Sequence, residues 1–494
     1  MVRLERHDGL DRDRYRRVVF HRDALQIAPA LLRAVDERRA AMLRHLESGA
    51  PAYGVTTGLG YLTRRSIPSE ERLALQRSIL LGRSVGVGPS YPAEVVRGAM
   101  LLRLTGFLSG DAAVSAALCS LLAERLNDGW TPYVPIGQHG SAGEVIPLSH
   151  LFQTLVGEGD VIEDGRRRPA QEALAARGVA PYEPGLKEGQ ALVGGAPFAP
   201  ALAFVLADRA RALLDHATLA AGLASALIGA SSRPFSHRIG RLKGDPGQLD
   251  VHRRLLELLD GGDWNDRPQS PVSYRVAPQL YGAVTDMLEA LERQLERELR
   301  AVTDSPVFLP AEGGEPEGFY PTGNWHSQAL AFWLDSVAIA FAQLANLSEK
   351  RLHRLLDSRF SGLPDQLAFK PGMQTGAVVL HKAIVALCAE NRMLATPASV
   401  NAADTSLGQE DVEAFASLAG DKLWRLLDNV ELVLAYEFVG LRQARAFRET
   451  PLGARLERAC DLLASVVEPI TADRSLSPDV ARMCGLIRAG SLLA

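Results

Sequence analysis

The stretch SQALAFWLDSVAIAFAQLANLSEKRLHRLLD, residues 327–357, decides the fold class. Its apolar residues recur at intervals of three and four, as at Leu330, Leu334 and Val337, with charged and polar residues between them. This period places the apolar side chains on one face of an α-helix. The stretch therefore predicts one long amphipathic helix.

Two further stretches have the same period: VAPQLYGAVTDMLEALERQLERELRAV (276–302) and DKLWRLLDNVELVLAYEFVGLRQARAF (421–447). Several long helices in succession predict a helical bundle, because each must bury its apolar face against another. Signals for strands are few and short. We therefore expect a mainly α fold.

The first part of the chain has a different pattern, in which short helical segments alternate with stretches rich in Gly and Pro. Examples are YGVTTGLG (53–60), VGVGPSYP (85–92) and YVPIGQHGSAGEVIP (133–147). Such stretches form turns and loops. We expect a loop-rich N-terminal domain over residues 1–198 and a long-helix bundle domain over residues 199–494.

The composition excludes some classes of function. Of the 494 residues, 54 are Lys or Arg and 58 are Asp or Glu, which gives a formal net charge of -4. A nucleic-acid-binding protein, or one that binds an anionic membrane, would carry an excess of basic residues. A small-molecule ligand or a protein partner is expected instead.

The four cysteines indicate neither a metal site nor disulfides. They lie at positions 119, 388, 460 and 484, with no CxxC pair, so we expect no bound metal. The N-terminus has no apolar signal-like region, and the most apolar run, residues 217–230, is too short to span a bilayer. These features favour a cytoplasmic protein.

Polar connections follow or precede the long helical stretches and are candidates for an active site. They are QSPVSYRVAPQLYG (269–282), VTDSPVF (302–308), TGNWHSQ (322–328) and NAADTSLGQED (401–411). Loops held by a rigid scaffold often carry catalytic residues. The alternative is that each connection only caps a helix, since Asp, Ser, Thr and Asn satisfy free N–H groups of a first turn.

Taken in order, these motifs resemble those of the aromatic amino acid ammonia-lyases, which act on histidine, phenylalanine or tyrosine, and of the related aminomutases. The resemblance also includes LQRSILLGRSVGVG (75–88), KEGQALVGG (187–195) and SEKR (348–351), and it extends from about Tyr53 to about Glu437. It implies a mainly helical homotetramer whose active sites are built from loops of more than one subunit.

The family makes an electrophile from its own backbone. An Ala-Ser-Gly tripeptide cyclises and loses water to give an exocyclic methylidene, the group called MIO, and the serine oxygen is the leaving group. The corresponding stretch here is GQHGSAGEVIPLSH, residues 137–150. Counting back from its PLSH places Ser141, Ala142 and Gly143 on the tripeptide, so alanine occupies the serine position.

A shift of one residue would put Ser141 at the centre of the tripeptide. The attacking nitrogen would then belong to Ala142, and the spacing to Pro147 would be one residue too long. We therefore expect that MIO does not form and that the protein has no cofactor. His139 falls where the family has an apolar residue, and we expect it to be structural.

Residues that contact MIO in the family are also changed. Gly194 stands where the family has an asparagine that hydrogen-bonds the ring, and Val272 stands where it has a tyrosine close to the ring. The supporting residues are therefore missing together with the serine.

Residues that the family assigns to the substrate are mostly retained. The resemblance makes Tyr53 the catalytic base and Arg275 the holder of the substrate carboxylate, a role that suits its planar charged fork. Asn324, Gln279 and Glu410 also match, Glu410 as a catalytic residue. The structural alternatives are that Tyr53 only packs in its loop, that Arg275 forms a surface ion pair, and that Glu410 is a charge at a helix terminus.

The pair of residues that contacts the substrate ring in the family reads Gly82-Arg83 here. An arginine at that place predicts an anionic or carbonyl group at the distal end of the substrate. The alternative is that Arg83 points to solvent or to a neighbouring subunit.

Two main hypotheses follow. In the first, the chain is a lyase-family enzyme that runs an elimination, addition or isomerisation without MIO on a small, amino-acid-like carboxylate, with Tyr53 or Glu410 removing a proton. In the second, it is a pseudoenzyme that binds a ligand or a partner without turnover. A conventional ammonia-lyase remains a third reading, through the shifted tripeptide.

Overall fold

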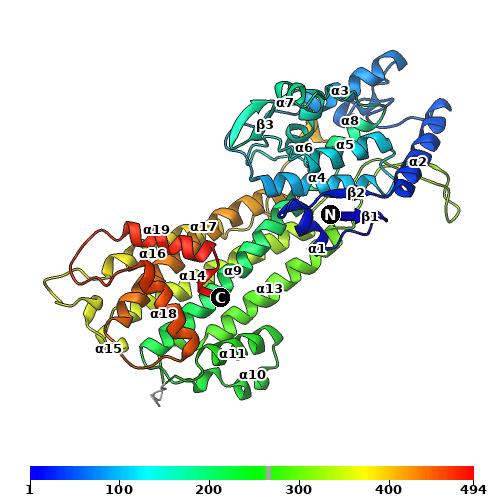
Figure 1. Cartoon of the computed structure of the whole chain (residues 1–494). Coiled ribbons are helices and arrows are strands. Elements are labelled where there is room, and N and C mark those ends of the chain that lie inside the picture. Colours follow the sequence, from blue (N-terminus) through cyan, green and yellow to red (C-terminus); the bar gives the residue numbers. More distant parts are fainter. Residues whose placement is uncertain (263–268, 494) are drawn as a thin grey trace. The chain divides into compact units, whose positions relative to one another are not determined.

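The computed structural model describes residues 1–262 and 269–493 and is mainly helical (Figure 1). Up to residue 200 the helices that begin are α1 (Arg12–Val19), α2 (Pro29–Glu47), α3 (Arg72–Leu81), α4 (Ala93–Phe107), α5 (Ala116–Asn127), α6 (Val145–Phe152), α7 (Ala170–Ala176), α8 (Glu188–Val193) and α9 (Phe198–Leu227). After them come α10 (His237–Lys243), α11 (Pro246–Leu258), α12 (Val272–Arg275), α13 (Ala277–Glu298), α14 (Gln328–Leu355), α15 (Ser358–Ser361), α16 (Val378–Leu394), α17 (Ala416–Arg445), α18 (Ala454–Val466) and α19 (Ser477–Arg488). The expected mainly α class is confirmed.

The strands in the described part of the chain are short and form two-stranded sheets. β1 (Val2–Leu4) pairs in parallel with β2 (Leu25–Ile27). β3 (Asp160–Glu163) and β4 (Arg166–Pro169) form one antiparallel pair, and β5 (Val307–Leu309) and β6 (Gly318–Tyr320) form another.

The three predicted long helices are present. The stretch 276–302 contains α13, 327–357 contains α14, and 421–447 overlaps α17. Leu330, Leu334 and Val337, the residues that defined the period, are fully buried. The periodic apolar face therefore packs inward, as the pattern indicates.

The chain divides into two compact units. The first unit contains residues 1–205, 292–332 and 398–421, and the second contains 206–291, 333–397 and 422–494. These units differ from the contiguous division into 1–198 and 199–494, because the chain passes between them several times: within α9, α13, α14 and α17 and in the connection between α16 and α17.

A buried ion pair joins the long helices of the second unit. The Arg351 guanidinium on α14 contacts the Glu437 carboxylate on α17 through Nε–Oε1 at 2.7 Å and Nη2–Oε2 at 2.8 Å. Its Nη1 donates to the Tyr281 hydroxyl on α13 at 2.7 Å. Since both charged side chains are 1% exposed, this bidentate geometry compensates two desolvated charges. The SEKR motif thus has a structural role here.

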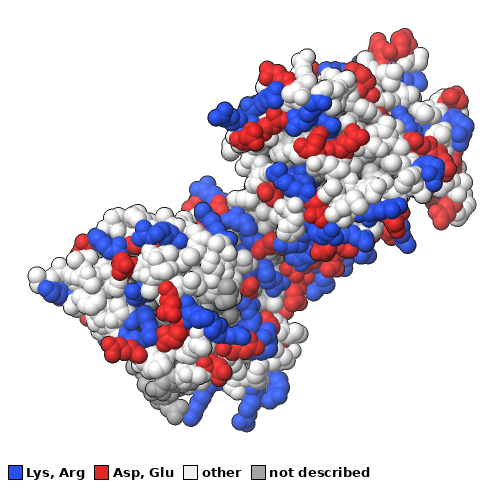
Figure 2. Space-filling model, viewed as in Figure 1, with Lys and Arg blue, Asp and Glu red and all other residues white. Residues whose placement is uncertain are grey.

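Two helical stretches, Glu188–Leu227 and Gln328–Leu355, are long and apolar enough to cross a membrane by length and composition alone. Most of each apolar window, 89% and 67%, is buried inside the protein, and the core helices of soluble proteins pass the same test. On the surface, Figure 2 shows basic and acidic residues interspersed over the visible face rather than gathered into a basic field.

Candidate active site

Tyr53 lies on a tight loop whose backbone requires glycine at the next position. Gly54 follows it with φ +69°, and a Cβ there would lie 2.7 Å from Gln190 Cγ. The loop turns back so that the backbone N–H of Gly60 donates to the Tyr53 hydroxyl at 2.8 Å. The Tyr53 side chain is 36% exposed, and its oxygen is held at the surface of the loop by this bond.

Glu410 contacts the segment that corresponds to the MIO tripeptide. Its Oε2 accepts the backbone N–H of Ala142 at 2.8 Å, and its Oε1 accepts the Ser406 hydroxyl at 2.7 Å. A backbone bridge between Thr405 and Glu410 closes the turn that presents the carboxylate. Glu410 is therefore joined to Ala142, across 268 residues of sequence.

Arg83 lies two residues after α3 and is half-buried. Its Nη1 donates to the Ile79 carbonyl at 3.1 Å. Burial lowers the pKa of Arg83, whereas interaction with Tyr53 and Glu410 acts in the opposite direction. The structure thus brings Arg83, Tyr53 and Glu410 within electrostatic range of one another.

The tripeptide segment itself lines a small pocket. Ser141 donates its hydroxyl to the Gly143 carbonyl at 2.6 Å. The pocket has a volume of about 30 Å³, and its lining includes Ser141, Ala142, Gly143 and Trp325.

Two more residues that line this pocket were not selected from the sequence as site residues. Burial lowers the pKa of His139 to about 4, so the imidazole is neutral at neutral pH. Glu144 accepts the backbone N–H groups of Phe198 and Ala199 at 2.5 and 2.6 Å and caps α9, and burial raises its pKa to about 8. No sequence spacing connects either residue to Tyr53 or Arg83, so their position beside the pocket is seen only in the folded structure.

The surroundings of Gly194 do not fit MIO. A Cβ at Gly194 would lie 2.7 Å from Asp304 Oδ1 and 3.2 Å from Gln190 Nε2. Asp304 cannot withdraw easily, because Arg103 Nη2 and Lys187 Nζ each bind its carboxylate at 3.0 Å. The asparagine side chain that the family places here would have to displace the Asp304 carboxylate from these two cations. Together with the missing hydroxyl at Ala142, the residues present do not support the group.

The remaining predicted residues take no part in these contacts. Asn324, in the first unit, is exposed, and its side chain donates to the Val302 carbonyl at 3.4 Å. Arg275, Gln279 and Val272 belong to the second unit. In the described chain, buried Arg275 Nε and Gln279 Oε1 have no hydrogen-bond partner, whereas Val272 is 58% exposed. Buried polar atoms without a protein partner are available to hydrogen-bond a ligand.

Comparisons with known proteins agree with the motif order. A model of the aromatic amino acid lyase family matches residues 10–465. A histidine ammonia-lyase of Aromatoleum aromaticum is 35% identical over 484 residues, which cover 96% of this chain and 91% of that protein. One from Deinococcus radiodurans is 33% identical over 496 residues, covering 98% of this chain and 94% of that protein. The tyrosine aminomutase from Streptomyces globisporus is 28% identical, with a TM-score of 0.91 over 99% of this chain and 97% of that one.

Proposed function

Because the chain belongs to the aromatic amino acid lyase family, we propose that it is a lyase that has kept the family's scaffold and acts without MIO. The observation that carries this proposal is the packing at Gly194, where a MIO-binding side chain would have to displace the Asp304 carboxylate. Ala142 adds the chemical reason, since it has no β-oxygen to lose.

Without an electrophile from the enzyme, the substrate has to make its own proton acidic. A carbonyl or carboxylate next to the carbon that loses the proton does this, because it spreads the developing negative charge over oxygen. We propose that Tyr53 takes the proton, that the C–H electron pair forms a double bond, and that the leaving group departs with its own pair. Addition is the same sequence in reverse, and isomerisation combines the two.

Arg83 is the group proposed to stabilise the charge that develops on the substrate. Its half-buried guanidinium lies within electrostatic range of Tyr53 and Glu410, and a preorganised cation stabilises such charge. Arg275 is proposed to bind the substrate carboxylate, which its unpaired Nε supports. The proposed substrate is therefore a small, amino-acid-like acid with a second anionic or carbonyl group.

A homotetramer is the proposed assembly. Apolar side chains on two helices of the second unit are exposed, namely Ile339 on α14 and Val379, Val385 and Met393 on α16, at 44%, 45%, 45% and 74%. A subunit interface would cover exposed apolar side chains such as these. A closed arrangement of four chains would bury them and would add residues around the small pocket beside Ala142.

Restoring the serine alone is expected to leave the protein without histidine or phenylalanine ammonia-lyase activity. Ala142→Ser supplies the missing oxygen, but Gly194 and Val272 still lack the side chains that support MIO. The measurement is urocanate and cinnamate formation by the variant, with unchanged thermal unfolding as the check that it is folded. Either product above the level of the unsubstituted protein would contradict the proposed role of the Gly194 packing.

Arg83→Met is expected to weaken binding of acids with two anionic or carbonyl groups and to leave simple monocarboxylates unaffected. Loss of one charge-assisted hydrogen bond costs about 1.5–3 kcal/mol, or roughly ten- to hundredfold in affinity. Arg275→Met is expected to weaken both kinds of acid by a similar factor. Titration calorimetry on acids selected by a thermal-shift screen measures this.

Arg64→Met, at an exposed arginine of the first unit, is the matched control and should bind like the unsubstituted protein. If no small acid binds, or if Arg83→Met changes nothing, the enzyme proposal gives way to a non-catalytic role.

A further inference from the structure

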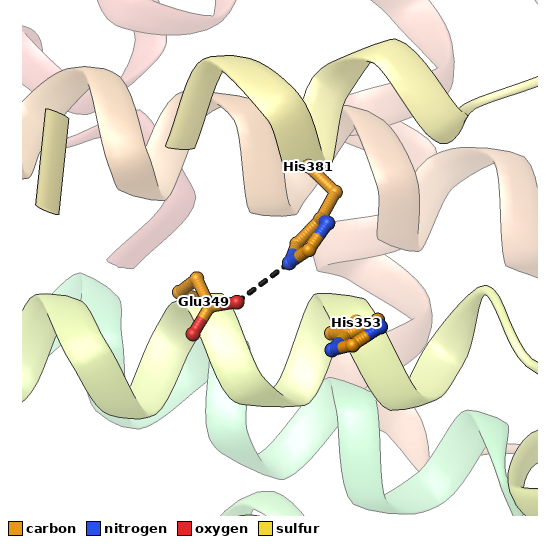
Figure 3. A group of neighbouring side chains, drawn as sticks. All are labelled: Glu349, His353 and His381. Atoms are coloured by element: carbon orange, nitrogen blue, oxygen red, sulfur yellow. Dashed lines mark hydrogen bonds and ion pairs between the residues drawn. The ribbon is translucent and has the colours of Figure 1, made fainter. Parts of the chain in front are cut away.

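Three metal-ligating side chains converge in the second unit, whereas the cluster around Tyr53 belongs to the first. Glu349 and His353 lie one turn apart on α14, and His381 faces them from α16 (Figure 3). One ligand atom from each lies within 4.8 Å of the others. The His381 Nε2 is 2.5 Å from Glu349 Oε1, and the two imidazole rings stack with centroids 4.4 Å apart.

The burial of these groups is graded, as in a site that an ion can enter. The Glu349 side chain is 6% exposed, that of His381 is 17% exposed, and His353 is exposed to solvent. A buried carboxylate needs a cation or strong donors near it. Lys350 Nζ binds Glu349 Oε2 at 2.8 Å, which leaves Oε1 directed to the histidines.

We propose that Glu349, His353 and His381 form a binding site for a divalent transition-metal ion, with Zn²⁺ as the preferred occupant. Two imidazole nitrogens and one carboxylate oxygen are a typical Zn²⁺ ligand set, and the open side at His353 leaves a fourth position for water. Mg²⁺ and Ca²⁺ prefer oxygen ligands and do not suit two histidines.

The geometry needs only small side-chain movements to hold the ion. With bonds of about 2.0–2.2 Å in a tetrahedral site, ligand atoms lie roughly 3.4 Å apart. The Glu349–His381 contact has to open by about 1 Å from its present 2.5 Å, while the exposed His353 ring turns inward. The ion would then replace the proton that these two groups share.

Lys350 and Arg354 are positive charges that oppose a cation here. The Lys350 side chain is 58% exposed and can extend into solvent. Because the ligands come from two helices, the ion would link α14 to α16. Binding to the folded state alone would stabilise it. This inference concerns the helical bundle and does not depend on the proposed lyase reaction.

The test is a Zn²⁺ titration of the untagged full-length protein by calorimetry, with Co²⁺ absorption as a fingerprint of tetrahedral ligation. We expect one ion per chain and a rise in Tm of roughly 2–5 °C with saturating Zn²⁺. His353→Asn should weaken binding by about a hundredfold, since it removes one ligand of three. His353 is exposed, so this variant should fold normally.

Glu349→Gln and His381→Asn should weaken Zn²⁺ binding by a similar factor. The matched control is His21→Asn, an exposed histidine in the first unit, which should bind Zn²⁺ like the unsubstituted protein. Absence of stoichiometric Zn²⁺ binding, or binding that His353→Asn leaves unchanged, would overturn the proposal.

Discussion

Replacing Tyr53 with phenylalanine is expected to lower turnover by about 10²- to 10⁴-fold, the usual contribution of a positioned acid or base. The ring and its packing stay, so substrate affinity should change little. The loss of the Gly60 N–H bond to the hydroxyl is cheap, because Tyr53 is 36% exposed and water can replace the bond. The measurement is product formation, followed by mass spectrometry, from the acid that binds best.

Tyr61→Phe is the matched control. Tyr61 lies on the same loop, next to Gly60, and is 60% exposed, so removal of its hydroxyl should leave turnover unchanged. If Tyr53→Phe turns over as fast as the unsubstituted protein, Tyr53 only packs the loop and the proposed mechanism is wrong.

Asp304→Ala is expected to cause a large loss of stability, about 3–5 kcal/mol, because it breaks a buried ion pair by removing one partner. Asp304 binds both Arg103 and Lys187, and the three side chains are 1%, 2% and 0% exposed. Without the carboxylate, two desolvated cations remain close together. The midpoint of unfolding in urea measures the loss.

Asp461→Ala provides the comparison, because Asp461 is an exposed aspartate on α18 and surface changes cost within about 0.5 kcal/mol. Equal unfolding midpoints for the two variants would contradict the role given to Asp304. Equal midpoints would also mean that Asp304 is not firmly held against Gly194 by its two cations.

The long helices could be predicted because a repeating apolar pattern depends only on residues that are close together in the sequence. The apolar period over 276–302 indicates α13 at 277–298, and that over 327–357 indicates α14 at 328–355. The two units could not be derived in this way, since they join segments such as 1–205 and 398–421 that are distant in sequence. Only contacts in the folded chain define them.

The sequence names candidate site residues one by one but does not predict their arrangement. The motifs named Tyr53, Arg83 and Glu410, yet no pattern relates Glu410 to the N–H of Ala142, and none places Asp304 against Gly194. The zinc proposal departs from the expectation of no metal, which rested on the spacing of the cysteines. Its ligands His353 and His381 come from different helices, so no short motif contains them.

The intact mass of the purified protein tests the central claim, that this chain acts without MIO, most directly. The account predicts the mass of the encoded chain and no near-ultraviolet absorbance beyond that of its aromatic residues. Cyclisation and dehydration would instead remove two molecules of water from the chain. A mass lower by two waters, localised to peptides that span residues 139–144, would contradict the account.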